Sequence, residues 1–90
     1  MSTTYDVINP ATESIVKTIE HYDLAATDNA IAKASKAFES WRAISPGDRG
    51  KLLRRFADVV ADHKEELALL EITNSGHARG NALWEVDNVV

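Results

Sequence analysis

Cysteine is absent from this sequence of 90 residues. Its absence excludes disulfides, thiolate metal sites and a cysteine nucleophile from what the chain does by itself. Long apolar runs are missing too: the longest is Leu67–Leu70, far shorter than a membrane-spanning helix or a signal-peptide core. Basic residues are fewer than acidic ones: the sequence has 10 Lys and Arg and 14 Asp and Glu, which gives a net charge of −4. We therefore expect a soluble, cytoplasmic protein that binds neither nucleic acid nor an anionic membrane surface.

The first segment has the pattern of a β-hairpin. Residues 5–20 read YDVINPATESIVKTIE, in which two runs rich in Val, Ile, Thr and Tyr flank a turn that contains Pro10. Proline has no N–H for a strand ladder, and β-branched residues suit strands. The pattern predicts a hairpin over about residues 5–20. Such a hairpin is only marginally stable alone, and the sequence offers no third strand.

The rest of the chain has helical periodicity. Apolar residues recur at three- and four-residue spacing over about residues 27–42, 46–75 and 81–90. The middle stretch either runs straight through or kinks near Asp62. The sequence thus predicts one α/β unit over residues 1–90: an N-terminal hairpin followed by three or four amphipathic α-helices.

Local residue types predict where these helices begin and end. Thr27 is the expected N-cap of the first helix, and Ser45 followed by Pro46 is the expected start of the second. Gly76 is expected to close the second, since glycine accepts the left-handed conformation at a helix end. The predicted buried stripe of the middle stretch is Leu52, Leu53, Phe56, Val59, Val60, His63, Leu67 and Leu70, and that of the last helix is Leu83, Val86 and Val90.

Known binding motifs are not matched. The segment Gly76–Gly80 has two glycines, yet it lacks the Lys-Ser/Thr of a P-loop and the spacing of a dinucleotide fingerprint. His21, His63 and His77 show no pair at i and i+4 and have no neighbouring cysteine, so their spacing does not indicate a metal site. The glycine-bearing segment is better interpreted as the end of one helix and the start of the next.

Catalytic and nucleic-acid patterns are equally weak. Ser75, His77 and Asp87 include the residue types of a hydrolase triad, but no nucleophile-elbow glycines surround the serine. The basic cluster on the second helix is interspersed with acids, which favours a self-neutralising solvated face. The residues of this basic cluster are Arg49, Lys51, Arg54 and Arg55. Two further sets have the residue types of a functional site: carboxylates that are expected to face water, which are Glu65, Glu66 and Glu71, and aromatics at a spacing typical of a core, which are Phe38, Trp41 and Trp84.

Four sequence motifs, taken in order, indicate a family where the periodicity alone does not. The order of four motifs resembles the beginning of the aldehyde dehydrogenase superfamily, from about Val7 to about Trp84. These motifs are Asn9–Glu13 before an Ile-Val strand, Ala37–Arg42, Arg49–Ala57, and Leu67–Glu71 with Gly76 five residues on.

This resemblance implies that the chain is the N-terminal part of a Rossmann-type coenzyme-binding domain. Family members oxidise an aldehyde to a carboxylic acid through a cysteine thiolate, transfer hydride to NAD or NADP, and use a glutamate to activate water. Those parts lie downstream of this segment, so we assign no catalytic and no cofactor-binding residue here. The resemblance also implies an aldehyde substrate and a homo-oligomer for the full-length enzyme.

Two departures from the family pattern bear on local structure. Glu13 stands where many relatives have glycine, which implies either a turn that needs no positive φ or some tolerated strain. Asn74 stands where some members have an acid that, with backbone carbonyls just before the turn, holds an alkali cation. The matching positions of that site here are Val7, Ile8 and Asn74, although an amide oxygen is a weaker cation ligand than a carboxylate.

Two functions remain open from the sequence. In the first, the apolar helix faces cover a larger domain of an enzyme, and the segment is inactive alone. In the second, the chain is a free-standing helical module that binds a partner or itself through the same faces.

Overall fold

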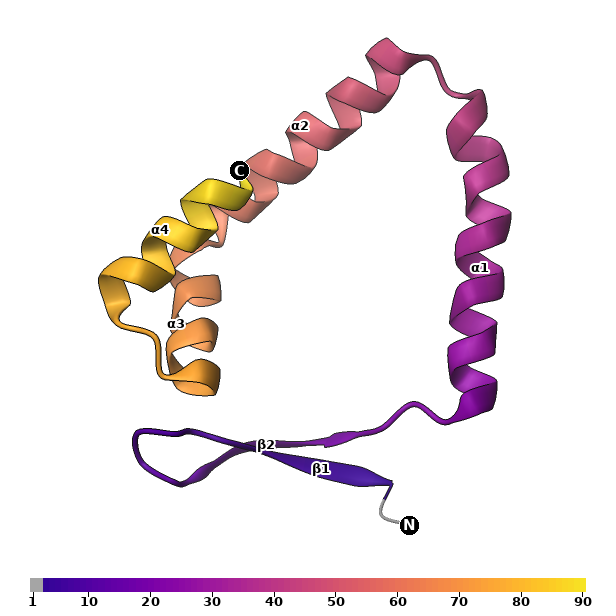
Figure 1. The fold of residues 1–90 in the computed structure, drawn as a ribbon. Coiled ribbons are helices and arrows are strands. Elements are labelled where there is room, and N and C mark those ends of the chain that lie inside the picture. Colours follow the sequence, from indigo (N-terminus) through magenta and orange to yellow (C-terminus); the bar gives the residue numbers. More distant parts are fainter. Residues whose placement is uncertain (1–2) are drawn as a thin grey trace.

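The computed structural model describes residues 3–90, whose elements run around an open frame (Figure 1). In chain order, these elements are two strands followed by four helices. They are β1 (Thr4–Ile8), β2 (Ile15–Glu20), α1 (Leu24–Ala43), α2 (Pro46–Asp62), α3 (Lys64–Ser75) and α4 (Arg79–Val89). The predicted hairpin followed by three or four helices is confirmed, with four helices.

The two strands form an antiparallel hairpin. Val7 pairs with Lys17 and Ile8 with Ile15, so the register shifts by one residue next to the turn. Across the strands, the Thr18 hydroxyl donates a hydrogen bond of 2.6 Å to Asp6. Nearly every residue of both strands is exposed, so the hairpin contributes no layer to a core.

The hairpin turn contains a strained residue. Glu13 has φ of 61°, in the left-handed region that favours glycine, and its N–H donates to the Asn9 carbonyl at 2.8 Å. Of the two alternatives for this departure from the family pattern, the structure agrees with tolerated strain.

We predict that Glu13→Gly stabilises the hairpin. An L-residue in this conformation costs about 1–2 kcal/mol, and the greater freedom of glycine in the unfolded chain offsets part of the gain, leaving about 0.5–1 kcal/mol. Hairpin population is measured from cross-strand amide and Hα nuclear Overhauser effects. Ala11→Gly is the matched control in the same turn, since Ala11 has no positive φ. Equal effects of the two substitutions would contradict the strain argument.

The first helix begins earlier than the sequence predicted. Asp23, not Thr27, is its N-cap: the Asp23 carboxylate accepts the Ala26 N–H at 2.7 Å. Thr27 lies inside the first turn, where its hydroxyl donates to the Asp23 carbonyl at 2.9 Å. The Asp23 carboxylate is a better cap than the Thr27 hydroxyl, because it accepts a free N–H and its negative charge is stabilised at the positive end of the helix dipole.

The long middle stretch is divided into two helices. His63, with φ of −104° and ψ of 17°, separates α2 from α3, and its Nδ1 lies 2.8 Å from the Val59 carbonyl. Of the two alternatives for this stretch, the structure has the kink near Asp62. The predicted start at Ser45 is confirmed, because its hydroxyl accepts the Asp48 N–H at 3.2 Å. The predicted stop is confirmed as well, since Gly76 has φ of 77° at the end of α3.

The small core lies where α3 and α4 pack together. Its buried residues are Ala68, Ala82 and Val86, with Val60, Ile72 and Leu83 packed around them. The predicted buried stripe is therefore wrong for most of its members, since Phe56 is 64% exposed and Leu53 59% exposed. The reason is that, among the described residues, α2 packs mainly against α4 and touches the end of α1 only through Arg49. In the last helix, Val86 is buried as predicted but Val90 is exposed.

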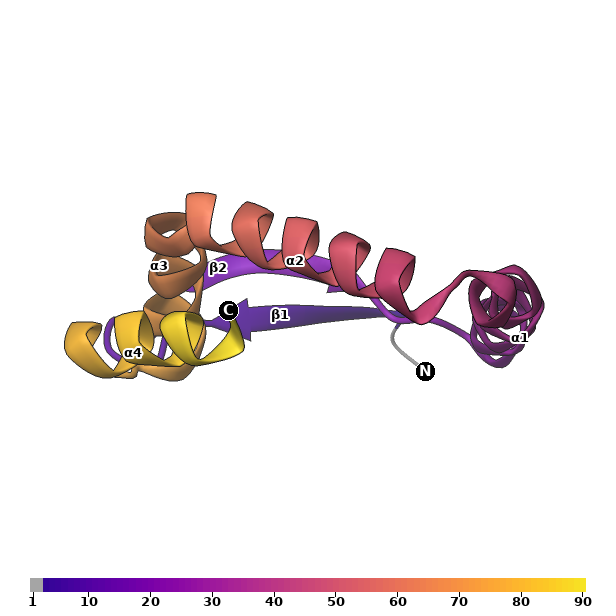
Figure 2. The same ribbon diagram turned by 90° about the horizontal axis from the view of Figure 1, so that it is seen from above.

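The molecule is flat and expanded. Its extents are 48 × 38 × 14 Å, so it is about one element thick, as Figure 2 shows from above. Its radius of gyration is 17.4 Å, whereas a compact domain of this length has about 12 Å. The apolar faces of α1 and α2 therefore have no covering layer among residues 3–90. No helix in that range is long and apolar enough to cross a membrane.

Candidate functional site

The glycine-bearing segment between α3 and α4 is a structural junction. A Cβ on Gly76 would lie 3.0 Å from Pro10 Cγ in the hairpin turn, so this glycine is needed for close packing as well as for its positive φ. Gly80 lies in the first turn of α4 with open space around it. The segment is thus occupied by a helix end and the hairpin turn, and it does not form a phosphate cradle.

The triad residue types are not brought together as a triad. Ser75 donates to the Glu71 carbonyl at 2.7 Å and to Glu71 Oε1 at 3.0 Å. Asp87 pairs instead with Lys64 at 2.7 Å and so ties α4 to the start of α3. The serine therefore lacks the histidine base that a nucleophile needs.

The basic cluster has a structural use. Arg49 extends back from α2 and donates to the Ile44 carbonyl and, at 3.4 Å, to the Arg42 carbonyl, which caps the C-terminal end of α1. Cations near the last carbonyls of a helix are stabilising. Among the water-facing acids, Glu65 pairs with Arg79 at 3.0 Å. Neither arrangement tests the self-neutralising face predicted for α2, because Arg49 bonds to carbonyls and the Glu65–Arg79 pair joins α3 to α4.

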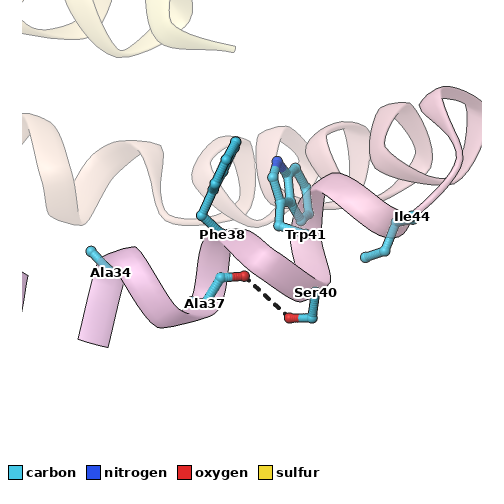
Figure 3. Close-up of a pocket in the computed structure, with 6 residues that line it drawn as sticks. All are labelled: Ala34, Ala37, Phe38, Ser40, Trp41 and Ile44. Carbon is cyan, nitrogen blue, oxygen red and sulfur yellow. Dashed lines mark hydrogen bonds between the residues drawn. The ribbon is translucent and has the colours of Figure 1, made fainter. Parts of the chain in front are cut away.

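A shallow apolar hollow follows the C-terminal half of α1. Phe38 and Trp41 project from the same side of the helix, above Ala34 and Ala37 (Figure 3). The hollow has a volume of about 470 Å³. Phe38 is 57% exposed and Trp84 is 65% exposed, so residues 3–90 do not bury these two aromatics as predicted, whereas Trp41 is half-buried. A face of this kind is suited to packing against another apolar surface.

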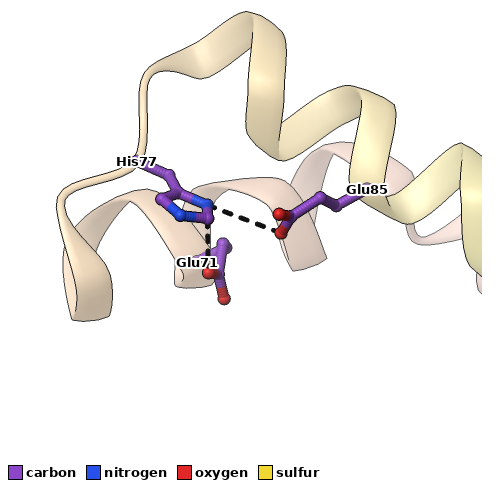
Figure 4. A group of neighbouring side chains, drawn as sticks. All are labelled: Glu71, His77 and Glu85. Atoms are coloured by element: carbon purple, nitrogen blue, oxygen red, sulfur yellow. Dashed lines mark ion pairs between the residues drawn. The ribbon is translucent and has the colours of Figure 1, made fainter.

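A cluster that the sequence pattern did not indicate lies at the α3–α4 junction. His77 Nδ1 is 3.3 Å from Glu71 Oε1 and 3.5 Å from Glu85 Oε2 (Figure 4). Glu71 belongs to α3, Glu85 to α4, and His77 to the connection between them. Because the three residues are divided between two helices and a connection, only the packing of α4 on α3 brings their side chains together. All three are partly exposed, with side-chain exposures of 41 to 46%.

The proposed alkali-cation positions lie near the same junction. Val7 and Ile8 end β1 just before the turn, and Asn74 lies in the last turn of α3. The close approach of Pro10 to Gly76 brings these two segments to one end of the molecule. The site at Val7, Ile8 and Asn74 stays a prediction.

Residues 3–90 thus form an exposed hairpin and helices whose large apolar side chains on α1 and α2 are mostly exposed. The model of the aldehyde dehydrogenase family matches residues 1–90. The chain therefore belongs to the aldehyde dehydrogenase family, as the resemblance implied, and it corresponds to the N-terminal segment of its members.

Individual relatives agree with this assignment. The chain is 39% identical over 75 residues to the cytosolic 10-formyltetrahydrofolate dehydrogenase of Xenopus tropicalis, covering 81% of this chain and 8% of that protein. It is 40% identical over 75 residues to the mitochondrial 10-formyltetrahydrofolate dehydrogenase of Homo sapiens, again covering 81% and 8%. It is also 39% identical over 83 residues to the mitochondrial succinate-semialdehyde dehydrogenase of Oryza sativa, covering 92% of this chain and 16% of that protein. The chain thus spans less than a fifth of the length of these relatives.

Proposed function

We propose that this segment is the opening part of the coenzyme-binding domain of an NAD- or NADP-dependent aldehyde dehydrogenase. In that enzyme an aldehyde is oxidised to a carboxylic acid. The observation that carries the proposal is the family match over residues 1–90 together with the absence of cysteine from those residues. The family's chemistry needs a thiolate to attack the aldehyde, so the reacting groups belong to sequence outside this segment.

The uncovered helix faces support a structural role within such an enzyme. Phe38 on α1 and Phe56 on α2 are both more than half exposed, although apolar side chains of this size gain about 1.5–3 kcal/mol each on full burial. A nucleotide-binding sheet contributed by the rest of the enzyme is the layer that would cover them. The same sheet would supply the neighbour that β1 and β2 lack.

The wider setting of the enzyme follows from the same proposal. The full-length protein is a homo-oligomer in the cytoplasm, acts on an aldehyde, and binds neither nucleic acid nor membrane. The net charge of −4 supports the part of this proposal that concerns nucleic acid and anionic membrane surfaces, since both attract basic proteins.

We predict that the 90-residue chain alone neither oxidises aldehydes nor binds NAD or NADP tightly. The reasons are the missing cysteine and the Gly76–Gly80 segment, which is filled by a helix end instead of a phosphate cradle. The chain is incubated with either coenzyme and a panel of aliphatic aldehydes and semialdehydes, and reduced nicotinamide is followed by absorbance. Coenzyme binding is measured by calorimetry. Turnover above a buffer control, or micromolar coenzyme binding, would refute the proposal.

A free-standing helical module that binds itself or a partner is the second candidate, and the exposed faces of α1 and α2 are the observation that favours it. Sequencing the coding DNA past the codon of Val90 distinguishes the two. An in-frame continuation that encodes a cysteine-containing coenzyme domain supports the enzyme segment. A stop codon supports the module.

A further inference from the structure

The cluster of Glu71, His77 and Glu85 has the composition of a metal site. One imidazole nitrogen and two carboxylate oxygens, one ligand atom from each residue, all lie within 4.8 Å of one another. Imidazole suits zinc, copper, iron and nickel, whereas calcium and magnesium prefer oxygen ligands alone. The mixture of ligands therefore favours an ion of the zinc class over Ca²⁺ or Mg²⁺.

The two distances from His77 fit such an ion, and no two of the three ligand atoms are more than 4.8 Å apart. A zinc ion lies about 2.0–2.2 Å from nitrogen and oxygen ligands, so tetrahedral geometry separates two ligand atoms by about 3.3–3.5 Å. His77 Nδ1 lies 3.3 Å from Glu71 Oε1 and 3.5 Å from Glu85 Oε2. Figure 4 shows both carboxylates directed at the same nitrogen. A single ion in front of Nδ1 can therefore reach all three ligands after small side-chain movements.

The surrounding charges leave the two carboxylates available. Arg79, two residues after the histidine, is engaged by Glu65 at 3.0 Å, and Lys64 is engaged by Asp87 at 2.7 Å. Neither cation pairs with Glu71 or Glu85, so with a neutral imidazole the cluster carries a charge of −2. A divalent cation neutralises this charge. A protonated histidine neutralises only half of it, and exposed ion pairs of that kind contribute at most about 1 kcal/mol.

The first ligand is held by a neighbour. The single proton of the Ser75 hydroxyl is shared between the Glu71 carbonyl at 2.7 Å and Glu71 Oε1 at 3.0 Å, and the second branch contacts the carboxylate oxygen that faces His77. Partners that orient ligating groups in this way raise metal affinity. The ligands also come from both helices and the connection between them, so a bound ion would link α3 to α4.

We propose that Glu71, His77 and Glu85 bind one divalent transition-metal ion of the zinc class, with the fourth position open to water. The site is independent of the enzyme chemistry proposed above, since the family's reaction needs none of these residues. By bridging α3 and α4, the ion stabilises the junction that packs on the hairpin turn.

Titration of the 90-residue chain with Zn²⁺ tests the proposal. We expect one ion per chain by calorimetry, and visible absorption bands typical of four-coordinate geometry when Co²⁺ is used instead. Affinity should fall at acid pH, because the ligands must be deprotonated to bind. The absence of Zn²⁺ binding at millimolar concentration would overturn the proposal, whatever the variants do. Binding of Ca²⁺ more tightly than Zn²⁺ would overturn it as well.

Variants locate the ion. His77→Gln and Glu85→Gln should each weaken Zn²⁺ binding by more than about 100-fold, and Ser75→Ala by about tenfold, because loss of a supporting partner costs about 10–100-fold. His21→Gln is the matched control, since His21 directly follows β2 and its ring lies against Tyr5, outside the cluster. Helix content by circular dichroism checks that each variant keeps its fold. Equal weakening by His21→Gln, or no weakening by His77→Gln, would contradict the assignment.

Discussion

The isolated 90-residue chain is expected to show helical far-ultraviolet dichroism, weak near-ultraviolet signals and either a broad thermal transition or an oligomer in light scattering. The physical reason is the distribution of apolar surface. The buried residues among those described are two alanines and one valine, while α1 and α2 keep Ile31 and Phe56 at 63% and 64% exposure. Each large side chain gains about 1.5–3 kcal/mol on burial, so the chain either packs loosely or covers these faces with a second copy.

Substitution of the exposed faces shows which outcome operates. If copies associate through α1 and α2, Phe38→Ser combined with Phe56→Ser should shift the oligomer to monomer while helix content is retained. Val89→Ser is the matched control, because Val89 is 69% exposed and lies on α4, outside the faces of α1 and α2. A sharply cooperative transition of a monodisperse monomer would instead show that these residues form a complete domain. The argument for a missing covering layer would then fail.

The second large effect is expected at the end of α3. Gly76→Ala should destabilise the junction of α3, α4 and the hairpin turn by about 1–2 kcal/mol for the left-handed backbone alone. A further cost arises because the new Cβ would meet Pro10 Cγ at 3.0 Å. Loss of protection is measured by amide hydrogen exchange in α3 and α4, which reports local stability even where global unfolding is not cooperative.

Gly80→Ala is the matched control for this prediction. Gly80 has the same substitution chemistry, but it lies inside α4 with nothing within 4 Å of the added atom. Alanine should therefore stabilise the helix by about 0.5–1 kcal/mol. Opposite signs at the two glycines are the expected result. Destabilisation of equal size at both would show that any side chain in this connection is harmful, and the close approach of Pro10 would not be the cause.

The sequence predicted the elements that depend on local chemistry. Ser45 before Pro46, and Gly76 after an apolar run, are signals whose physical basis lies within one helical turn, and the structure has both. The sequence did not decide between one continuous helix and a kink near Asp62. The polar residue Asp62 is the one local feature there that interrupts the helical period of apolar residues. The start of α1 was misplaced because Thr27 and Asp23 are both good caps, and the apolar pattern becomes regular only at the later one.

The sequence did not predict correctly which apolar side chains are buried, because burial depends on the surface that covers them. The period of α2 correctly identifies an apolar face, but periodicity does not tell whether this segment also contains the surface that covers it. For that reason Phe56 was predicted to be buried and is exposed. The cluster of Glu71, His77 and Glu85 was missed for a related reason. Its members lie on two helices and a connection, and only the way α4 packs on α3 makes them neighbours.

The pairing of elements with near neighbours in the chain has a consequence for synthesis on the ribosome. β1 contacts β2, α3 contacts α4, and α4 also contacts α2. Contacts of this kind close short loops and form quickly. In a protein that continues beyond these residues, the hairpin and the α3–α4 pair can therefore form as soon as they leave the exit tunnel. The faces of α1 and α2 must wait for the later strands, and during that interval a nascent-chain chaperone that holds apolar helices would protect them from aggregation.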